Sequence, residues 1–340
     1  MLQALTVRTP RLGSGFRQYG IIIAFLALCV VVAALCQYKV IQGEWSENTF
    51  LTAENLLLIL YQISVNGILA IGMTLVVISA GIDLSVGSVL ALSGMLAASF
   101  ATRSTTVTAW AGTYPVLVPV LAALAIGSAC GALNGWIIAR FRIQAFIATL
   151  GMLLAARGMT MALTGANPIS ALSPDFRWFG TERILGIPVP ILIFLLVFAG
   201  AWVLLNLTVF GRYVYAVGGN EKSARTSGIK TDRIIIGVYA LSGLLAGIAG
   251  IILTAKTGSG QTNAGSSYEL DAIAAAVIGG TSLAGGVGKL GGTLIGALII
   301  GVMNNGLDLL GVESFYQLII KGVLIVSAVI VDSSRKAEQH

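Results

Sequence analysis

Ten apolar segments follow one another along the chain, and they constrain its fold more than any other feature. A helix that crosses a bilayer needs about 20 predominantly apolar residues, and most of the segments reach that length. Only 10% of the residues are charged, against about 25% in ordinary globular proteins. We therefore predict an all-α, polytopic membrane protein with about ten transmembrane helices. The predicted helices are 20–41, 57–80, 86–102, 115–139, 144–164, 189–209, 234–255, 268–283, 290–309 and 316–332.

Two of the predicted helices, 86–102 and 268–283, are short for a bilayer crossing. We expect one of them to be tilted, broken or re-entrant, and eight crossings remain an alternative count. The first segment, 20–41, follows basic residues, as the apolar part of a signal peptide does. It is longer than the roughly 7–15 apolar residues of a signal peptide, so we expect it to remain as a membrane anchor.

The basic residues predict the orientation of the bundle, because cytoplasmic loops carry an excess of Lys and Arg. With a cytoplasmic N-terminus, most of the 20 basic residues fall in inner loops, and the even number of helices puts both termini inside. We divide the chain into a cytoplasmic segment 1–19, a transmembrane domain 20–332 and a cytoplasmic tail 333–340. The spread of charge over short loops argues against a nucleic-acid partner. The inner basic residues are Arg8, Arg11, Arg17, Arg140, Arg142, Arg212, Lys222, Arg225, Lys230, Arg233, Lys289, Arg335 and Lys336.

A carboxylate separates the second and third apolar segments, where Asp83 lies in the break Gly81–Ser85. A charge at that depth is costly, and membrane proteins usually keep one only where backbone or water surrounds it. In one interpretation Asp83 caps the helix that follows, because Asp is favoured at helix N-caps. In the other the turn is a contact surface for a partner, and both interpretations can hold together.

The inner segment 210–233 contains residues that start and end helices. Gly218 and Gly219 are predicted to break the preceding helix, and Asn220 to cap a helix of about two turns. Gly228 then ends that short helix. A short capped helix on the cytoplasmic face is suited to docking another protein, and a solvated connector is the alternative.

The outer segment 165–188 contains several prolines, which keep it out of regular helix. We expect it to lie on the external surface. Acidic residues such as Asp175 and Glu182 gather on this side. They form either a docking rim for a partner that arrives from outside, or only the complement of the basic inner loops.

Uncharged polar side chains lie within the apolar segments, and they are the candidates for a translocation path. Amides both donate and accept hydrogen bonds, so they suit a neutral polyhydroxylated solute better than an ion. Hydrogen bonding between helices of the bundle is the alternative for each of them. The candidate path residues are Asn66, Thr74, Asn134, Asn304 and Asn305.

A weak internal echo links Ser85–Leu90 with Gly286–Gly291, each of which follows one apolar helix and starts another. Both breaks would face the cytoplasm in the predicted topology. Many transporters are built from repeated halves, so an internal repeat is an open alternative.

The chain has no recognisable catalytic, ATPase or metal-binding motif. The Gly-rich stretch that ends at Lys289 fails as a phosphate loop, because Leu283 and Leu290 occupy the positions of the first Gly and the Ser/Thr. The single histidine is His340, and the three cysteines show no metal-ligand spacing. A proton relay through acidic residues such as Asp83 and Asp271 is weakened by their positions near predicted helix ends.

Four blocks of sequence resemble the sugar permeases of bacterial ATP-binding-cassette (ABC) importers, most closely those for ribose. The resemblance covers roughly residues 50–332, and residues 1–50 match less well. Related permeases for branched-chain amino acids are a rival within the same class, and a stand-alone secondary carrier or facilitator is the alternative from another class. The four blocks are 64–94, 144–160, 211–229 and 268–311.

This resemblance implies a permease subunit in the bacterial inner membrane that is not itself an enzyme and forms the path as a dimer with a second copy. It also implies a sugar-binding protein docking outside and an ABC ATPase on the cytoplasmic face that binds ATP and Mg²⁺, so this chain itself needs no cofactor. The sequence GGNEKSARTSGI then becomes the segment that couples the permease to the ATPase, together with the Asp83 turn. The predicted coupling residues are Asn220, Glu221, Ala224, Arg225, Ser227, Gly228, Asp83 and Ser85.

Overall fold

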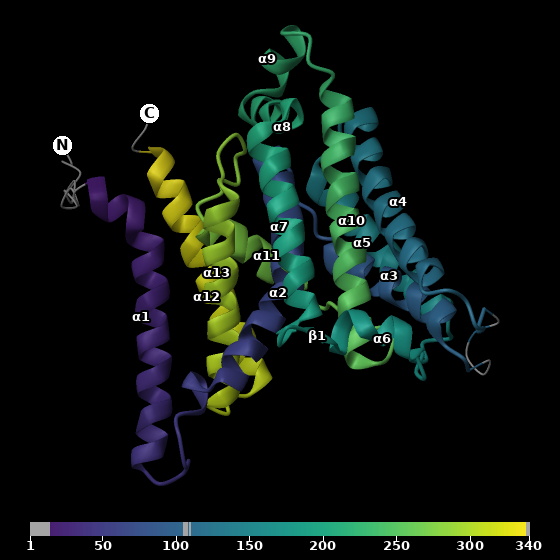
Figure 1. The fold of residues 1–340 in the computed structure, drawn as a ribbon. Coiled ribbons are helices and arrows are strands. Elements are labelled where there is room, and N and C mark those ends of the chain that lie inside the picture. Colours follow the sequence, from purple (N-terminus) through teal and green to yellow (C-terminus); the bar gives the residue numbers. More distant parts are fainter. Residues whose placement is uncertain (1–13, 105–107, 109, 338–340) are drawn as a thin grey trace, which may run out of the picture.

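The structure is a computed structural model that describes residues 14–104, 108 and 110–337. The predicted basic residues Arg8 and Arg11 and the terminal His340 lie outside the described residues. Each of the ten predicted segments contains a helix (Figure 1). These helices are α1 (Ser14–Ile41), α2 (Ala53–Ile78), α3 (Val86–Ala101), α4 (Leu117–Phe141), α5 (Ala145–Ala162), α7 (Val189–Leu207), α10 (Thr231–Thr257), α11 (Tyr268–Ile278), α12 (Leu290–Leu309) and α13 (Ser314–Ala337).

Short elements lie at the two ends of the helix bundle (Figure 1). One end, called the α9 end here, carries α8 and α9, and the first turn of α1 and the last turn of α13 lie toward it. The opposite end, called the α6 end, carries α6 and an antiparallel pair of strands. The short elements are η1 (Thr49–Leu51), α6 (Pro174–Thr181), β1 (Arg183–Ile184), β2 (Ile187–Pro188), α8 (Val209–Gly219) and α9 (Glu221–Thr226).

Seven helices in the described part of the chain are long and apolar enough to cross a membrane: α1, α2, α4, α5, α7, α10 and α12. The helices α3 and α11 have only 16 and 11 residues. The helix α13 spans 24 residues, Ser314–Ala337. The all-α membrane class is therefore as predicted, while α3 and α11 are each too short to cross a bilayer alone.

The two short helices begin next to each other inside the bundle. Gly87 in the first turn of α3 faces the backbone carbonyl oxygen of Gly265, where an added Cβ would lie 2.2 Å from that oxygen. The same Cβ would lie 2.5 Å from a carboxylate oxygen of Glu269, in the first turn of α11. Both predicted short segments are therefore helices that start within the bundle.

From this common point α3 and α11 run in opposite directions. α3 runs toward the α6 end, where Thr102 pairs with Leu172, and α11 runs toward the loop that leads into α12. The breaks at 85–90 and 286–291 differ in depth, because Ser85 is 1% exposed inside the bundle while Val287 is 62% exposed. That both face the cytoplasm remains a prediction. The arrangement that does occur twice is a long helix, a break and a short helix, in α2–α3 and again, in the opposite direction, in α10–α11. Transporters built from such inverted units carry their path near the broken helices.

Glycines bring α4 and α10 into backbone contact at the centre of the bundle. A Cβ at Gly131 would lie 2.1 Å from the Tyr239 carbonyl oxygen, and one at Gly243 would lie 2.1 Å from the Gly127 carbonyl oxygen. In lipid, close packing of small residues takes the place of hydrophobic burial as the force between helices. This seam holds α10 rigidly against its neighbour.

The outer segment 165–188 differs from the prediction of irregular structure, because it contains α6 and the β1–β2 hairpin. Pro174 is the first residue of α6, a position where the missing N–H of proline costs no hydrogen bond. Gly180 of this helix packs on the backbone of Lys256, and Phe176 is fully buried. The segment therefore caps the bundle at the α6 end.

At the other end, α8 includes Gly218 and Gly219 as its last two residues and ends there. Asn220 follows as the C-cap residue of α8 and the N-cap residue of α9. The predicted break between the two helices therefore lies at the end of the two glycines.

Candidate functional site

A polar cavity of about 380 Å³ lies between α2, α10, α11, α12 and α13. Tyr61 and Lys256 line it, and the backbone of Lys256 packs on Gly180 of α6. The cavity therefore lies in the half of the bundle toward the α6 end. Its charged lining residues are Lys256, Asp271, Asp308 and Lys321.

The most buried charge on the cavity wall is Asp271 of α11, which is 4% exposed. Its carboxylate accepts hydrogen bonds from the Lys321 ammonium of α13 at 3.1 Å and from the Asn304 amide of α12 at 3.5 Å. Burying a charge is costly unless it is paired and hydrogen-bonded. Asp271 thus ties three of the helices that surround the cavity.

Lys256 and Tyr61 make a second contact on the same wall. The Lys256 ammonium lies 3.4 Å from the centroid of the Tyr61 ring. A cation over an aromatic face is attracted by the ring quadrupole, more strongly where water is excluded. The contact joins the end of α10 to α2.

Two of the predicted path residues, Asn66 and Asn304, line this cavity. Asn305 does not, because it exchanges hydrogen bonds of 2.8 and 3.1 Å with Asn55 of α2. Successive helical residues point about 100° apart, which separates the two neighbouring amides of α12. For Asn305 the alternative of hydrogen bonding between helices therefore applies.

Thr74 and Asn134 also lie away from the cavity wall. The Thr74 hydroxyl is fully buried and lies 2.7 Å from the Thr293 hydroxyl of α12. Asn134 of α4 is fully buried and donates to the Ser85 hydroxyl at 3.0 Å. Both residues join helices away from this cavity, and a role in the path remains a prediction for them.

Asp83 lies inside the bundle rather than on its surface. Its carboxylate accepts hydrogen bonds from the Ser85 N–H (3.0 Å) and hydroxyl (2.6 Å) and from the hydroxyl of Ser242, midway along α10 (3.0 Å). The N-cap residue of α3 is Ser85, and no side chain caps this helix, so Asp83 stabilises the turn before α3 rather than capping it. A direct contact of Asp83 or Ser85 with a partner does not fit, because each residue is only 1% exposed.

Ion pairs attach α9 to the ends of two long helices. Arg142, which follows α4, donates to Glu221 at 2.6 Å and to Asp232 at 3.2 Å. Arg225 donates to the same two carboxylates, at 3.2 and 2.6 Å. Exposed ion pairs are individually weak, but together they set the position of α9 against α4 and α10.

The remaining predicted coupling residues shape α9. The Asn220 side chain caps the helix by accepting from the Ser223 N–H at 2.9 Å, and Ala224 is 5% exposed against the bundle. Ser227 is the C-cap, and Gly228 has the positive φ of 87° that favours glycine. The predicted short capped helix is confirmed. Lys222, Ser223 and Thr226 also form its exposed face, and the prediction did not include them.

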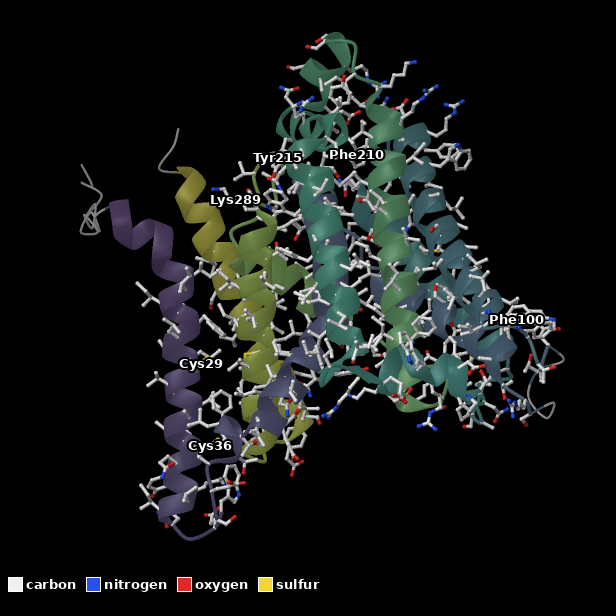
Figure 2. The ribbon with its side chains drawn as sticks, viewed as in Figure 1. Cys29, Cys36, Phe100, Phe210, Tyr215 and Lys289 are labelled. Atoms are coloured by element: carbon white, nitrogen blue, oxygen red, sulfur yellow. The ribbon has the colours of Figure 1, made fainter. Side chains whose placement is uncertain are left out.

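The helix α8, which precedes α9, packs on the end of α2 and on the loop between α11 and α12. A Cβ at Gly218 would lie only 1.7 Å from the Ile78 carbonyl oxygen, which accepts from the Gly286 N–H at 2.8 Å. The Tyr215 hydroxyl donates to the Gly288 carbonyl at 2.8 Å. Figure 2 labels Tyr215 and Lys289, the residue after Gly288. These contacts connect α8 to α2 and to the loop between α11 and α12, three helices that surround the cavity.

Sequence reasoning missed Tyr61, Lys256 and the pairing of Lys321 with Asp271. A signal existed for the pair, because a lysine within an apolar segment is a candidate functional residue that needs a partner. Nothing in the sequence signals the contact of Lys256 with Tyr61, since the two helices are far apart along the chain.

The chain is similar to known transport proteins over most of its length. Residues 55–329 match a family model described as the permease component of the branched-chain amino acid transport system. The ribose import permease protein of Escherichia coli K12 is 52% identical over 93% of this chain and 93% of its own length. The ribose import permease protein of Bacillus subtilis 168 is 49% identical over 85% and 88%, and the D-allose transport system permease protein of E. coli K12 is 40% identical over 93% and 91%. No solved structure matches the chain.

The matched region contains the helices around the cavity and the α8–α9 segment. The family resemblance predicted from the four sequence blocks is therefore confirmed. The chain belongs to the family of transport-system permease components, and the relatives named above are its sugar permeases.

Proposed function

We propose that this chain is the permease subunit of an ATP-driven importer for a monosaccharide, ribose or a similar pentose or hexose. The observation that carries the proposal is the 52% identity to a ribose import permease over 93% of both chains. The polar cavity inside an apolar bundle supports it, because a neutral solute needs hydrogen-bonding groups along its route.

In this proposal the α9 end faces the cytoplasm of a bacterium and the protein lies in the inner membrane. Support comes from the basic residues of the α9 end, among them Arg140, Arg142, Arg212 and Lys222. An excess of Lys and Arg in short loops marks the cytoplasmic side. Both termini are then cytoplasmic, since α1 starts and α13 ends toward that end.

The exposed face of α9 is the proposed contact for an ABC ATPase, which supplies the ATP and Mg²⁺ chemistry. A movement of α9 would pull on α4 and α10 through Arg142 and Asp232. It would also reach α2 through the contact of Gly218 with Ile78. Discrete elements that both sites can bias are the physical basis of such coupling.

The α6 end is the proposed docking face for an extracytoplasmic sugar-binding protein. Its cap, α6 with the β1–β2 hairpin, presents exposed Asp175, Glu182 and Arg183. A second copy of this chain completes the path, as proposed from the family resemblance. Neither partner is needed to explain the fold of the single chain.

A pull-down of the tagged chain in mild detergent, with mass spectrometry of the bound proteins, tests this function. We expect an ABC ATPase to co-purify and the reconstituted complex to hydrolyse ATP in response to sugar-loaded binding protein. A preparation without ATPase that still moves sugar into liposomes would instead support the stand-alone carrier.

A further inference from the structure

Three residues that line the cavity each have a buried side-chain oxygen that lacks a hydrogen-bond partner within the described part of the chain. These oxygens are Tyr61 Oη, Asn66 Oδ1 and Asn304 Oδ1. Five other buried side-chain atoms without a partner are scattered through the described residues, so this cavity concentrates them. Leaving a buried polar atom unpaired costs free energy, and such atoms in native structures call for an explanation.

The chemistry of these groups fits a ligand with several hydroxyls. The two amide oxygens can only accept hydrogen bonds, and the phenol of Tyr61 can donate and accept. The Lys256 ammonium over the Tyr61 ring adds donors, and it forms no ion pair with any described residue. Each hydroxyl of a sugar donates one bond and accepts others, so it can satisfy both kinds of group.

The charges on the wall balance, so they call for no net charge on the ligand. Two basic and two acidic residues line the cavity, and the most buried acid, Asp271, is already paired with Lys321. The volume of about 380 Å³ lies within the range of small-molecule sites, about 300–1,000 Å³.

We propose that Tyr61, Asn66 and Asn304 form a carbohydrate subsite through which the permease itself discriminates among neutral monosaccharides. The proposal rests on the proposed function and adds a selective step beyond the external binding protein. In this subsite the amide oxygens accept from sugar hydroxyls. Tyr61 and Lys256 supply donors.

Tyr61→Phe is the sharpest variant. It removes only Oη, which has no described partner, and it keeps the aromatic ring under Lys256. We therefore expect an unchanged melting temperature with weaker sugar binding, whereas a hydroxyl with a structural role would lower the melting temperature. Asn66→Leu is the second variant, because Asn66 makes no described side-chain hydrogen bond. Asn304 is less suitable because its amide also bonds Asp271.

The experiment uses the full chain with its ATPase partner in lipid nanodiscs, without binding protein. Binding of D-ribose, D-allose, D-xylose and L-leucine is measured by saturation-transfer NMR titration. We expect sugar binding without leucine binding, and a loss of about fivefold or more in D-ribose affinity for each variant, about the worth of one hydrogen bond. Asn206→Leu on the exposed side of α7 is the matched control and should bind as the unaltered chain does.

Sugar affinity tests the subsite, and ATPase stimulation separately tests the importer function. Unchanged sugar affinity in both variants, or equal binding of leucine, would overturn the subsite. ATPase stimulation by loaded binding protein is measured on the same discs. If it is absent while the sugar affinities change as expected, the importer function fails and the subsite stands.

Discussion

Lys321 of α13 and Asp271 of α11 lie 50 positions apart in the sequence, and their side chains meet at 3.1 Å on the cavity wall. The carboxylate is 4% exposed. A carboxylate buried this deeply needs a counter-ion to stay charged, and Lys321 supplies it. The pair links α13 to a short helix that begins inside the bundle. Widening the cavity between α11 and α13 therefore requires this ion pair to separate or to move as a unit.

Replacing Lys321 by methionine should destabilise the protein by about 3–5 kcal/mol, because Asp271 is left buried without its counter-ion. Combining Lys321→Met with Asp271→Leu should recover most of that loss, since an apolar pair of similar volume replaces a buried ion pair at little cost. Thermal unfolding in detergent measures both. Equal losses in the single and double variants would mean that the packing of Lys321, not its charge, is what matters.

Asp83→Asn should leave folding and sugar import within about twofold of the unaltered protein. The asparagine oxygen can still accept from the Ser85 N–H, and its amide can donate to the Ser242 hydroxyl. Asp83→Leu, in contrast, leaves buried donors unpaired at about 1–3 kcal/mol each and should prevent stable folding.

Liposome uptake at several pH values measures this difference. A proton-driven carrier that used Asp83 would lose transport in the asparagine variant, because an amide cannot carry the proton. Retained uptake in Asp83→Asn would therefore assign the residue to the turn alone.

The sequence was sufficient for the elements whose signals are local. Apolar length predicted ten segments that each contain a helix, and the Asn220 and Gly228 signals predicted α9 at the residues where it lies. Each of these depends on neighbours along the chain.

What the sequence did not reveal depends on contacts between distant segments. Asn304 and Asn305 are the same residue type in the same helix, and only the neighbouring helices decide that one meets the cavity and the other meets Asn55. The depth of Asp83 follows from its contact with Ser242 on α10. Composition cannot distinguish a turn at the membrane surface from a turn inside the bundle.

Glu221→Gln should lower sugar-stimulated ATPase activity by about fivefold or more, a typical coupling free energy between two sites. The substitution removes the charge that holds Arg142 and Arg225 together. Stability should change by less than about 1 kcal/mol, because these pairs are exposed. Glu44→Gln, at the exposed pair with Lys39, is the matched control without effect on ATPase activity.

A charge exchange refines that test. Arg142→Glu combined with Glu221→Arg restores an attractive pair between α4 and α9 and should recover part of the activity. Complete inactivity of the exchanged variant, with normal binding of the ATPase, would show that Glu221 contacts the partner rather than positioning α9.

Gly218 and its neighbour Gly219 form a matched pair that tests whether the contact between α8 and α2 is needed for coupling to the ATPase. A Cβ at Gly218 would lie 1.7 Å from the Ile78 carbonyl oxygen, whereas a Cβ at Gly219 would meet nothing within 4 Å. Gly218→Ala must therefore push α8 away from α2, and we expect it to abolish sugar-stimulated ATPase activity or stable folding. Gly219→Ala should be neutral or stabilise α8 by up to about 1 kcal/mol. ATPase assays on both variants decide the matter: equal activities would mean that the contact between α8 and α2 carries no signal.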